Sequence, residues 1–437
     1  MSSVSSFTGD ANKPEPRASA PLIAVSSILI SMGLLALGTG LLHAYVPLRL
    51  AQIGQPPWVA GTMVSALAFG GLIGCFAIGW VVRRVSHART YVCMAAVIVI
   101  SALLLSLGNN PWLWVLARAL YGFAATGLFV VAQSWLNDAS ENQWRGRVLA
   151  VFYMMYVVGI GIGGYMLRLI ELNNTAAPML AILFVTLSML PIGLTRLNAP
   201  PPPESIAINV RAVWRISPVG LGAMIAVGGL TMMSQGFVPI FATSSGFSKD
   251  DVALLYLLMQ FGMFAIQLPL GAISDRTDRR FVLIAACVLV ITSAVVINQM
   301  SVLNLFWLIP VFAIWAGATE SIYSLANAHA NDRADPQYFV ALSSTLLVAW
   351  SVSGIVVPAV TSALMPIYGP KSFIYVTIFI AGALSVFVLF RLLKKDAVPQ
   401  EDTDPYQHIN SHVPYPTELV AIDEPVEQAP PGDKSAD

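Results

Sequence analysis

Charged residues are scarce in this sequence. Asp, Glu, Lys and Arg make up 11% of the 437 residues, whereas hydrophobic residues make up 57%. A soluble domain usually carries about 25% charged residues. The deficit excludes a soluble globular protein and predicts a chain that lies mostly in lipid.

The residue patterns of metal sites, disulfide frameworks and common enzymes are also missing. Cys75, Cys93 and Cys287 stand far apart within apolar runs and lack metal-ligand spacing, so we interpret them as small core residues. The sequence contains neither a phosphate-binding GxxxxGKS/T loop nor an HExxH helix. It therefore predicts no metal, no cofactor and no enzymatic activity.

Long apolar runs are instead abundant. A helix needs about 20 apolar residues to cross a bilayer, and irregular backbone cannot face lipid. The sequence therefore predicts an all-α membrane protein with twelve transmembrane helices in two pseudo-symmetric six-helix bundles. The predicted spans are 22–47, 58–82, 91–108, 112–136, 148–169, 178–196, 217–242, 251–272, 281–299, 304–326, 338–362 and 372–393.

The Lys and Arg residues set the predicted orientation. With the N-terminus in the cytoplasm, eighteen of the 23 lie in cytoplasmic segments, and only Arg49, Arg168, Lys249 and Lys371 lie in outer segments. Cytoplasmic loops of membrane proteins carry an excess of positive charge. We therefore expect both termini in the cytoplasm, and we attribute the basic loops to topology and not to nucleic-acid binding.

Proline and charge divide the chain into segments. Residues 198–204 hold four consecutive prolines and cannot continue a helix. The last 42 residues hold ten acidic residues and one basic residue, a composition that cannot offset the entropy cost of ordering. We predict a disordered cytoplasmic N-terminus at 1–20, a first bundle at 21–197, a cytoplasmic linker at 198–216, a second bundle at 217–395 and a disordered acidic cytoplasmic tail at 396–437.

The second half repeats the first at an offset of 192 residues, which drifts to 194 by the fourth spans. In transporters, such repeats enclose a site near the bilayer midplane and expose it to alternate sides. Duplication is also simply a way to build a large membrane bundle, and the sequence leaves that alternative open. The matched pairs include Pro47 with Pro239, Gly54 with Gly246, Gly70 with Gly262, Gly79 with Gly271, Arg84 with Arg276 and Asp138 with Asp332.

Several motifs resemble the major facilitator superfamily. Residues 271–280 (GAISDRTDRR) resemble its signature between the second and third spans of each half, and residues 79–89 keep the glycine and the basic residues. The first copy has Arg83 where the family usually has Asp. Arg118 followed by Gly122 resembles the fourth-span motif, and residues 45–49 and 145–153 resemble the YcaD-type bacterial branch. The glycine-rich fifth span lacks the proline of the antiporter motif, so antiport is not predicted.

The resemblance implies a secondary transporter in the bacterial inner membrane. We expect it to move a small molecule by alternating access, as a monomer in the lipid bilayer, with protons as the coupling ion. Hydrophobic, aromatic-rich spans favour efflux over sugar uptake. Other interpretations remain open: a facilitated-diffusion uniporter, sodium coupling, a non-transporting membrane sensor or scaffold of the same fold, or a membrane enzyme acting on lipid.

Three ionisable residues within the spans are candidates for proton or substrate coupling. Glu320 is the carboxylate deepest in an apolar span, and desolvation suits such an acid to proton uptake and release. Arg118 retains its proton and needs an anion, carbonyl groups or water. His43 titrates near physiological pH. For each, a purely structural hydrogen bond inside the bundle is the competing interpretation.

Buried amides and the loop motifs complete the candidate set. Five amides are candidate cavity-lining groups because buried amides need partners, from a substrate or another helix: Gln133, Gln235, Gln260, Gln267 and Asn327. Asp275 is expected to latch the inside closed against the positive N-terminal end of the fifth span near Arg147, with a weaker latch in the first half because Arg83 replaces the acid. The predicted gating residues are Gly79, Arg84, Gly271, Asp275, Arg276 and Arg280.

Overall fold

The protein is described from a computed structural model that covers residues 25–140, 142–172, 175–194, 200, 207–300, 304–394, 399, 403 and 406. The predicted N-terminal segment 1–20 and nearly all of the predicted tail lie outside the described residues. The described part contains twelve long helices, which confirms the predicted fold class. They are α2 (Ser26–Gln52), α3 (Pro57–Val85), α4 (His87–Ser106), α5 (Pro111–Ala139), α6 (Asn142–Tyr165), α7 (Ala176–Gly193), α9 (Pro218–Ser244), α10 (Lys249–Ser274), α11 (Arg279–Gln299), α12 (Leu305–Asn331), α13 (Phe339–Tyr368) and α14 (Ser372–Leu392).

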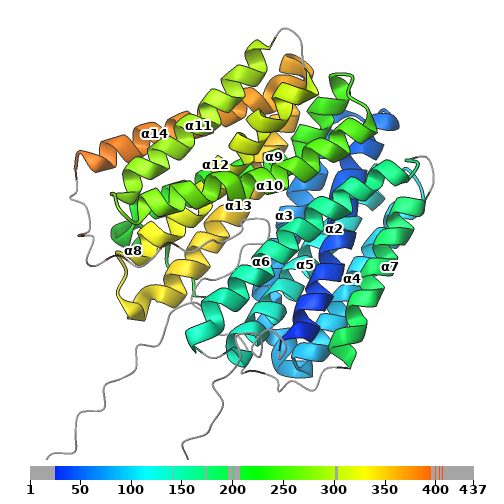
Figure 1. Ribbon diagram of the computed structural model, residues 1–437, viewed down its shortest axis with the longest axis horizontal. Helices are drawn as coiled ribbons and strands as arrows, with labels where there is room; N and C mark the ends of the chain where they lie inside the picture. The colour runs from blue at the N-terminus through cyan, green and yellow to red at the C-terminus, as the bar shows by residue number, and fades with distance from the viewer. Residues whose placement is uncertain are drawn as a thin grey trace, which may run out of the picture.

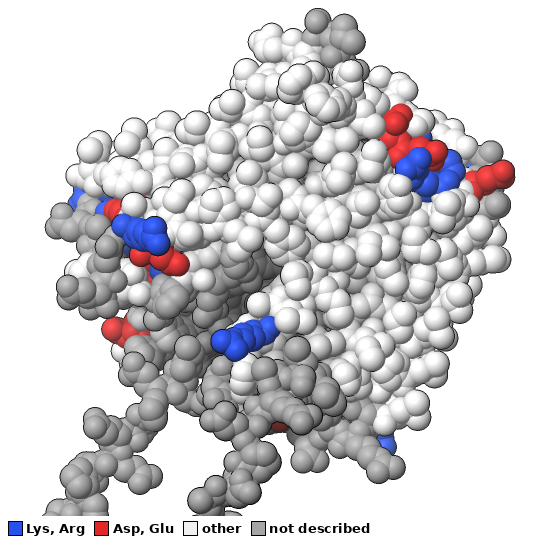
Figure 2. Space-filling view, viewed as in Figure 1, with Lys and Arg blue, Asp and Glu red and all other residues white. Residues whose placement is uncertain are grey.

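The surface of these helices suits a lipid environment. Eleven helical segments are long and apolar enough to cross a membrane, and the last of them, Phe339–Leu392, contains both α13 and α14. Large apolar side chains are exposed on their outward faces, among them Phe69, Trp80 and Phe379. Figure 2 shows charged residues gathered near two opposite edges of this face, with a broad uncharged surface between them. The protein is therefore a multi-pass membrane protein.

The two halves of the chain form two similar bundles (Figure 1). In the first, α3 packs along α5; in the second, α10 packs along α12 in the same way. A Cβ on Gly70 would meet the Ala119 carbonyl oxygen at 1.9 Å, and a Cβ on its repeat mate Gly262 would meet the Cβ of Ala313 at 2.3 Å. Glycine at the matched positions thus permits the same close helix contact in both bundles.

The connection between the bundles contains the short helix α8 (Val210–Ile216). The Asn209 side chain caps its start by accepting a hydrogen bond from the Ala212 N–H, and the Asn209 N–H donates to Thr345 of α13. The helix is therefore anchored to the second bundle. Most of residues 198–206 lie outside the described residues.

One boundary difference from the sequence prediction, at the end of α12, has a clear physical cause. The apolar run ends near residue 326, yet the helix continues to Asn331. The added turn carries Asn327 and His329, which are polar but only 2% and 4% exposed. The span predicted from hydropathy ends too early because these polar side chains are buried by neighbouring helices and do not contact lipid.

The two bundles meet at one end of the molecule, here named the outer end because the charge pattern predicts it to face away from the cytoplasm. The Ser65 hydroxyl of α3 donates to the Ile355 carbonyl of α13 at 2.6 Å. The Lys249 ammonium at the start of α10 donates to the carbonyls of Arg168 at 3.1 Å and Ile170 at 2.6 Å, which end the short 3₁₀ segment η1 (Met166–Leu169) after α6. Figure 2 shows a hollow between the halves, toward the opposite, inner end where α8 lies in Figure 1.

Candidate functional site

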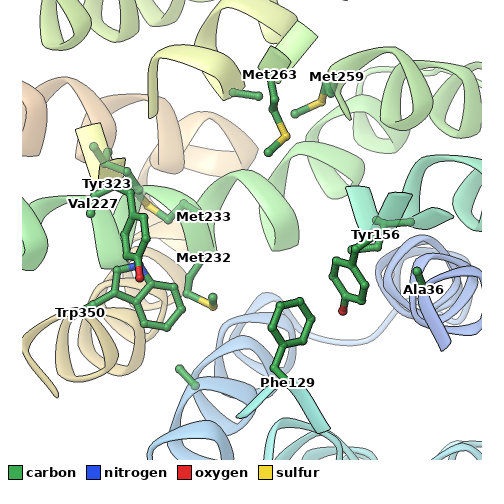
Figure 3. Close-up of a cluster of buried hydrophobic side chains, with 14 of the residues drawn as sticks. Ala36, Phe129, Tyr156, Val227, Met232, Met233, Met259, Met263, Tyr323 and Trp350 are labelled. Atoms are coloured by element: carbon green, nitrogen blue, oxygen red, sulfur yellow. The ribbon is translucent and has the colours of Figure 1, made fainter. Parts of the chain in front are cut away.

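Two adjoining cavities lie between the bundles. The larger comprises about 530 Å³ of space between atoms, its opening to solvent included, and is lined by the aromatic rings of Tyr121, Tyr156 and Trp350 together with small apolar residues. The smaller comprises about 420 Å³ on the same measure and shares His43, Leu67 and Met232 with the first. Figure 3 shows Met232 and Tyr156, which line the larger cavity, within a cluster of buried hydrophobic side chains that includes Phe129, Met259 and Met263. Flexible methionines and aromatic rings adapt to apolar ligands of varied shape.

Arg118 supplies the cationic group of the smaller cavity. It lies on α5, is 7% exposed, and its guanidinium carbon is 5.3 Å from the centre of the Tyr121 ring. Its Nη1 has no hydrogen-bond partner among the described residues. A buried cation without a full set of partners is expensive, so this position favours a ligand or water that accepts hydrogen bonds.

The structure brings two further predicted residues to the same cavity. His43 of α2 and its repeat mate Gln235 of α9 both line it. Each precedes a helix-internal proline by four residues, Pro47 and Pro239 respectively. Proline has no N–H, so the carbonyls of His43 and Gln235 lose their helical donors. The repeat thus places an irregular, polar turn of each bundle at one cavity.

Glu320 lies elsewhere, within the second bundle. It is 3% exposed on α12 and belongs to a polar cluster with Gln267 and Ser324, in which the Gln267 amide donates to the Ser324 hydroxyl at 2.8 Å. The Tyr406 phenol reaches the same cluster, where burial raises its pKa, Ser324 and Gln267 act to lower it, and Glu320 interacts with it electrostatically. Glu320 lines neither of the two cavities, so the structure separates it from Arg118.

The other amides also bind within or beside their own bundles. The Gln133 amide donates to the Tyr153 hydroxyl, and the Asn327 amide donates to the Tyr323 carbonyl at 3.0 Å, so both are held by side chains or backbone of their own half. Gln260 faces the other bundle, where its Cβ and Cγ lie 3.4 Å from a Cβ placed on Gly161 of α6. These three amides line neither cavity.

Asp275, the predicted latch, has a partner that the sequence did not indicate. Its Oδ1 accepts a hydrogen bond from the Tyr406 N–H at 2.8 Å and lies 3.8 Å from Arg279 Nη1. The Tyr406 ring packs on Gly271, where a Cβ would approach it to 2.4 Å. Burial raises the pKa of the Tyr406 phenol to about 12, so this side chain is neutral at physiological pH. The predicted latch of Asp275 on α6 stays a prediction.

The remaining gating candidates differ in their surroundings. Arg280 is 3% exposed and forms an ion pair of 2.6 Å with Asp278. Burial acts to raise the pKa of Asp278, but hydrogen bonds from the Arg280 side chain and N–H outweigh it and lower that pKa. Arg84 is exposed and lies over the Trp80 ring, 5.8 Å from its centre. Gly79 is half-buried in α3, and Arg276 is exposed in the loop between α10 and α11.

A buried ion pair at the inner end escaped the sequence reasoning. The Arg279 guanidinium binds the Asp332 carboxylate at 2.6 Å, and the two side chains are 3% and 2% exposed. The internal repeat could have indicated this ion pair. At the repeat offsets, His87 is the counterpart of Arg279, and Asp138 is the counterpart of Asp332. In the first half His87 instead contacts the Ser134 hydroxyl at 3.1 Å. The second half therefore has the stronger electrostatic tie between its third and fourth spans.

The comparisons with known proteins agree with this architecture. A family model of the Major Facilitator Superfamily matches residues 28–358 and 219–422. An uncharacterized MFS-type transporter of Yersinia pestis (strain Pestoides F) is 27% identical over 376 residues, covering 84% of this chain and 95% of that protein. The uncharacterized MFS-type transporter YcaD of Escherichia fergusonii is 24% identical over 389 residues, covering 88% and 98%.

A solved structure of a point mutant of the nucleoside transporter NupG superposes with a TM-score of 0.69 at 13% identity, covering 85% of this chain and 99% of that one. At this identity the likeness concerns the fold. The family match and the YcaD-type relatives confirm the resemblance to the superfamily and to its YcaD-type branch. The chain belongs to the Major Facilitator Superfamily of membrane transporters.

Proposed function

We propose that this protein is a secondary active transporter that moves a small molecule by alternating access. The observation that carries the proposal is the position of the cavity. It lies between two bundles that are tied together at the outer end by Lys249 and Ser65, while the surface is hollowed toward the inner end (Figure 2). This arrangement fits one state of a cycle in which rigid bundles rock around a central site.

Proton coupling through Glu320 is the second part of the proposal. The residue is a buried acid beside a hydroxyl, an amide and a phenol, and such intramembrane acids serve as proton carriers. His43 and Arg118 act at the substrate cavity instead. Glu320 and the cavity then communicate through the movement of α12 and α10 and not through direct contact.

The membrane location and orientation of the transporter are inferred from the distribution of Lys and Arg and from the family. We infer a bacterial inner membrane location with both termini in the cytoplasm, a monomeric unit, and export as the direction. The apolar and aromatic lining of the larger cavity supports export of an amphipathic compound. The alternatives are a uniporter and a non-transporting sensor of the same fold.

Flux in proteoliposomes tests the proposal. Purified protein is reconstituted with an internal pH-sensitive dye, and a library of small molecules is screened for proton movement that depends on the compound. Wild type is expected to couple compound flux to proton flux, and Glu320→Gln is expected to bind the same compound without proton movement. Compound flux that ignores the pH gradient would favour a uniporter, and specific binding with no flux would favour a sensor.

A further inference from the structure

The smaller cavity presents hydrogen-bond donors from both bundles. Arg118 of α5 and Gln235 of α9 line it together, and Nη1 of Arg118 and Nε2 of Gln235 have no hydrogen-bond partner among the described residues. The side-chain amide of Gln235 carries an NH₂ donor at one end and a carbonyl oxygen at the other, so it offers a donor in either orientation. The two helices belong to opposite bundles, so one acceptor between them would contact both.

The cavity contains a cation without an acid. No Asp or Glu is present among the residues that line either cavity. The ionisable groups that interact with Arg118 are the phenols of Tyr121 and Tyr256, and these are neutral acids at physiological pH. The guanidinium is charged at every accessible pH. Its charge therefore calls for an anion that the described part of the protein does not itself supply.

An apolar chamber adjoins this charge. The larger cavity shares His43 and Met232 with the smaller one, and its walls are mostly aromatic and aliphatic, with Thr126 and Ser351 as further polar groups. A ligand that fills both cavities carries its negative charge at one end and an apolar body at the other.

We propose that the substrate is an amphipathic organic anion whose carboxylate or phosphate binds Arg118 and Gln235 while its apolar body occupies the chamber beside Trp350. This inference rests on the proposed function and names its substrate class. Because the oxyanion bridges α5 and α9, its binding joins the two bundles in the outer half of the cavity. Planar guanidinium groups bind oxyanions through paired, charge-assisted hydrogen bonds, which a neutral or cationic analogue does not form.

Binding to the purified full-length protein tests this inference. The probes are 3-phenylpropionate and phenyl phosphate, with 3-phenylpropan-1-ol and 3-phenylpropylamine as neutral and cationic matches and inorganic phosphate as the anion alone. Thermal stabilisation and tryptophan fluorescence report binding. We expect the two organic anions to bind best, and Arg118→Gln to weaken them by about tenfold to a hundredfold, the usual effect of a lost charged hydrogen bond. Arg118→Lys keeps the charge and is expected to fall between.

Three further variants place the ligand. Gln235→Leu is expected to weaken anion binding by a few fold, and Trp350→Phe to remove the fluorescence change while keeping the thermal shift. Arg211→Gln is the matched control, because Arg211 is an exposed arginine on α8, and it is expected to bind like wild type. A fluorescence change that survives Trp350→Phe would place the apolar body elsewhere and overturn the inference.

The remaining outcomes separate this inference from the proposed function. Binding of the alcohol or the amine as tight as that of the acid, binding unaffected by Arg118→Gln, or no binding by either organic anion would overturn the substrate class. Stabilisation by inorganic phosphate with no gain from the phenyl group would overturn the role of the chamber. Anion binding that depends on Arg118 without flux in proteoliposomes would support the site and contradict transport.

Discussion

The close contact of the bundles at the outer end depends on glycine. A Cβ on Gly236 of α9 would lie 2.4 Å from Cγ2 of Val64 on α3, and a Cβ on Gly61 would lie 2.2 Å from the Cβ of Ser362 on α13. Ordinary contacts of this kind are about 3.5 to 4.0 Å. Gly236→Ala and Gly61→Ala therefore introduce overlaps of more than an ångström, and both overlaps lie between bundles.

The place of the overlap decides its effect. Overpacking in a fixed core costs about 1–3 kcal/mol as lost stability. Between two bodies that separate, the same strain is relieved when the outer ends part, so it appears as a change in the conformational equilibrium. A difference of 1–3 kcal/mol shifts that equilibrium by about 5-fold to 150-fold. We expect both variants to favour an outward-open state while keeping nearly all of their thermal stability.

Labelling from the outside measures this shift. A cysteine at Ile240, which lines the smaller cavity, is placed in a background without native cysteines and reacted with an impermeant maleimide. Its labelling rate is expected to rise in Gly236→Ala. Gly70→Ala is the matched control, because its Cβ would meet the Ala119 carbonyl at 1.9 Å within one bundle, so it is expected to lower the melting temperature without faster labelling. Unchanged labelling in Gly236→Ala would refute the idea that these glycines hold the outer end closed.

Three other predictions concern the inner end. Asp332→Asn leaves the buried Arg279 with only the more distant, exposed Asp275 as counter-charge and is expected to cost up to about 3–5 kcal/mol, measured by thermal unfolding in detergent; the exposed repeat mate Asp138 gives the control Asp138→Asn, and equal losses in both would contradict the assignment. Tyr406→Ala removes the ring that packs on Gly271 of α10 and is expected to lower the melting temperature in detergent; an unchanged melting temperature would indicate that the ring does not dock at this position. The pKa of Tyr406 is raised from 10.0 to about 12 by burial, so the docked state is fully stable below pH 10 and is lost as the pH rises through 12. The difference in tyrosinate absorbance between wild type and Tyr406→Phe measures this titration, and a midpoint near 10 would refute the buried placement.

The sequence predicted the repeated architecture for a local reason. An apolar run of sufficient length must form a helix in lipid whatever surrounds it, so the spans and the family could be found one segment at a time. The predicted span 372–393 differs from α14 (Ser372–Leu392) by one residue. At α12 the prediction stopped short because the burial of Asn327 and His329 depends on neighbouring helices.

The candidate site was predicted in part. His43 and Gln235 were paired by the repeat, and the structure places both in one cavity with Arg118. The grouping of Glu320 with Gln267 and Tyr406 could not be predicted in this way. These residues lie far apart in sequence, and which faces of their helices meet depends on how the helices rotate and cross.

The sequence by itself determined the class of protein, the twelve helices, the two halves and the family, because hydropathy, charge asymmetry and glycine spacing are properties of short segments. Only the tertiary structure decided which buried polar groups meet. It placed Arg118 opposite Gln235, separated both from Glu320, and set Lys249 on the carbonyls after α6. The physical reason is that hydrogen bonds and charge interactions act over a few ångströms, and the partners that satisfy them come from helices that are far apart in the sequence.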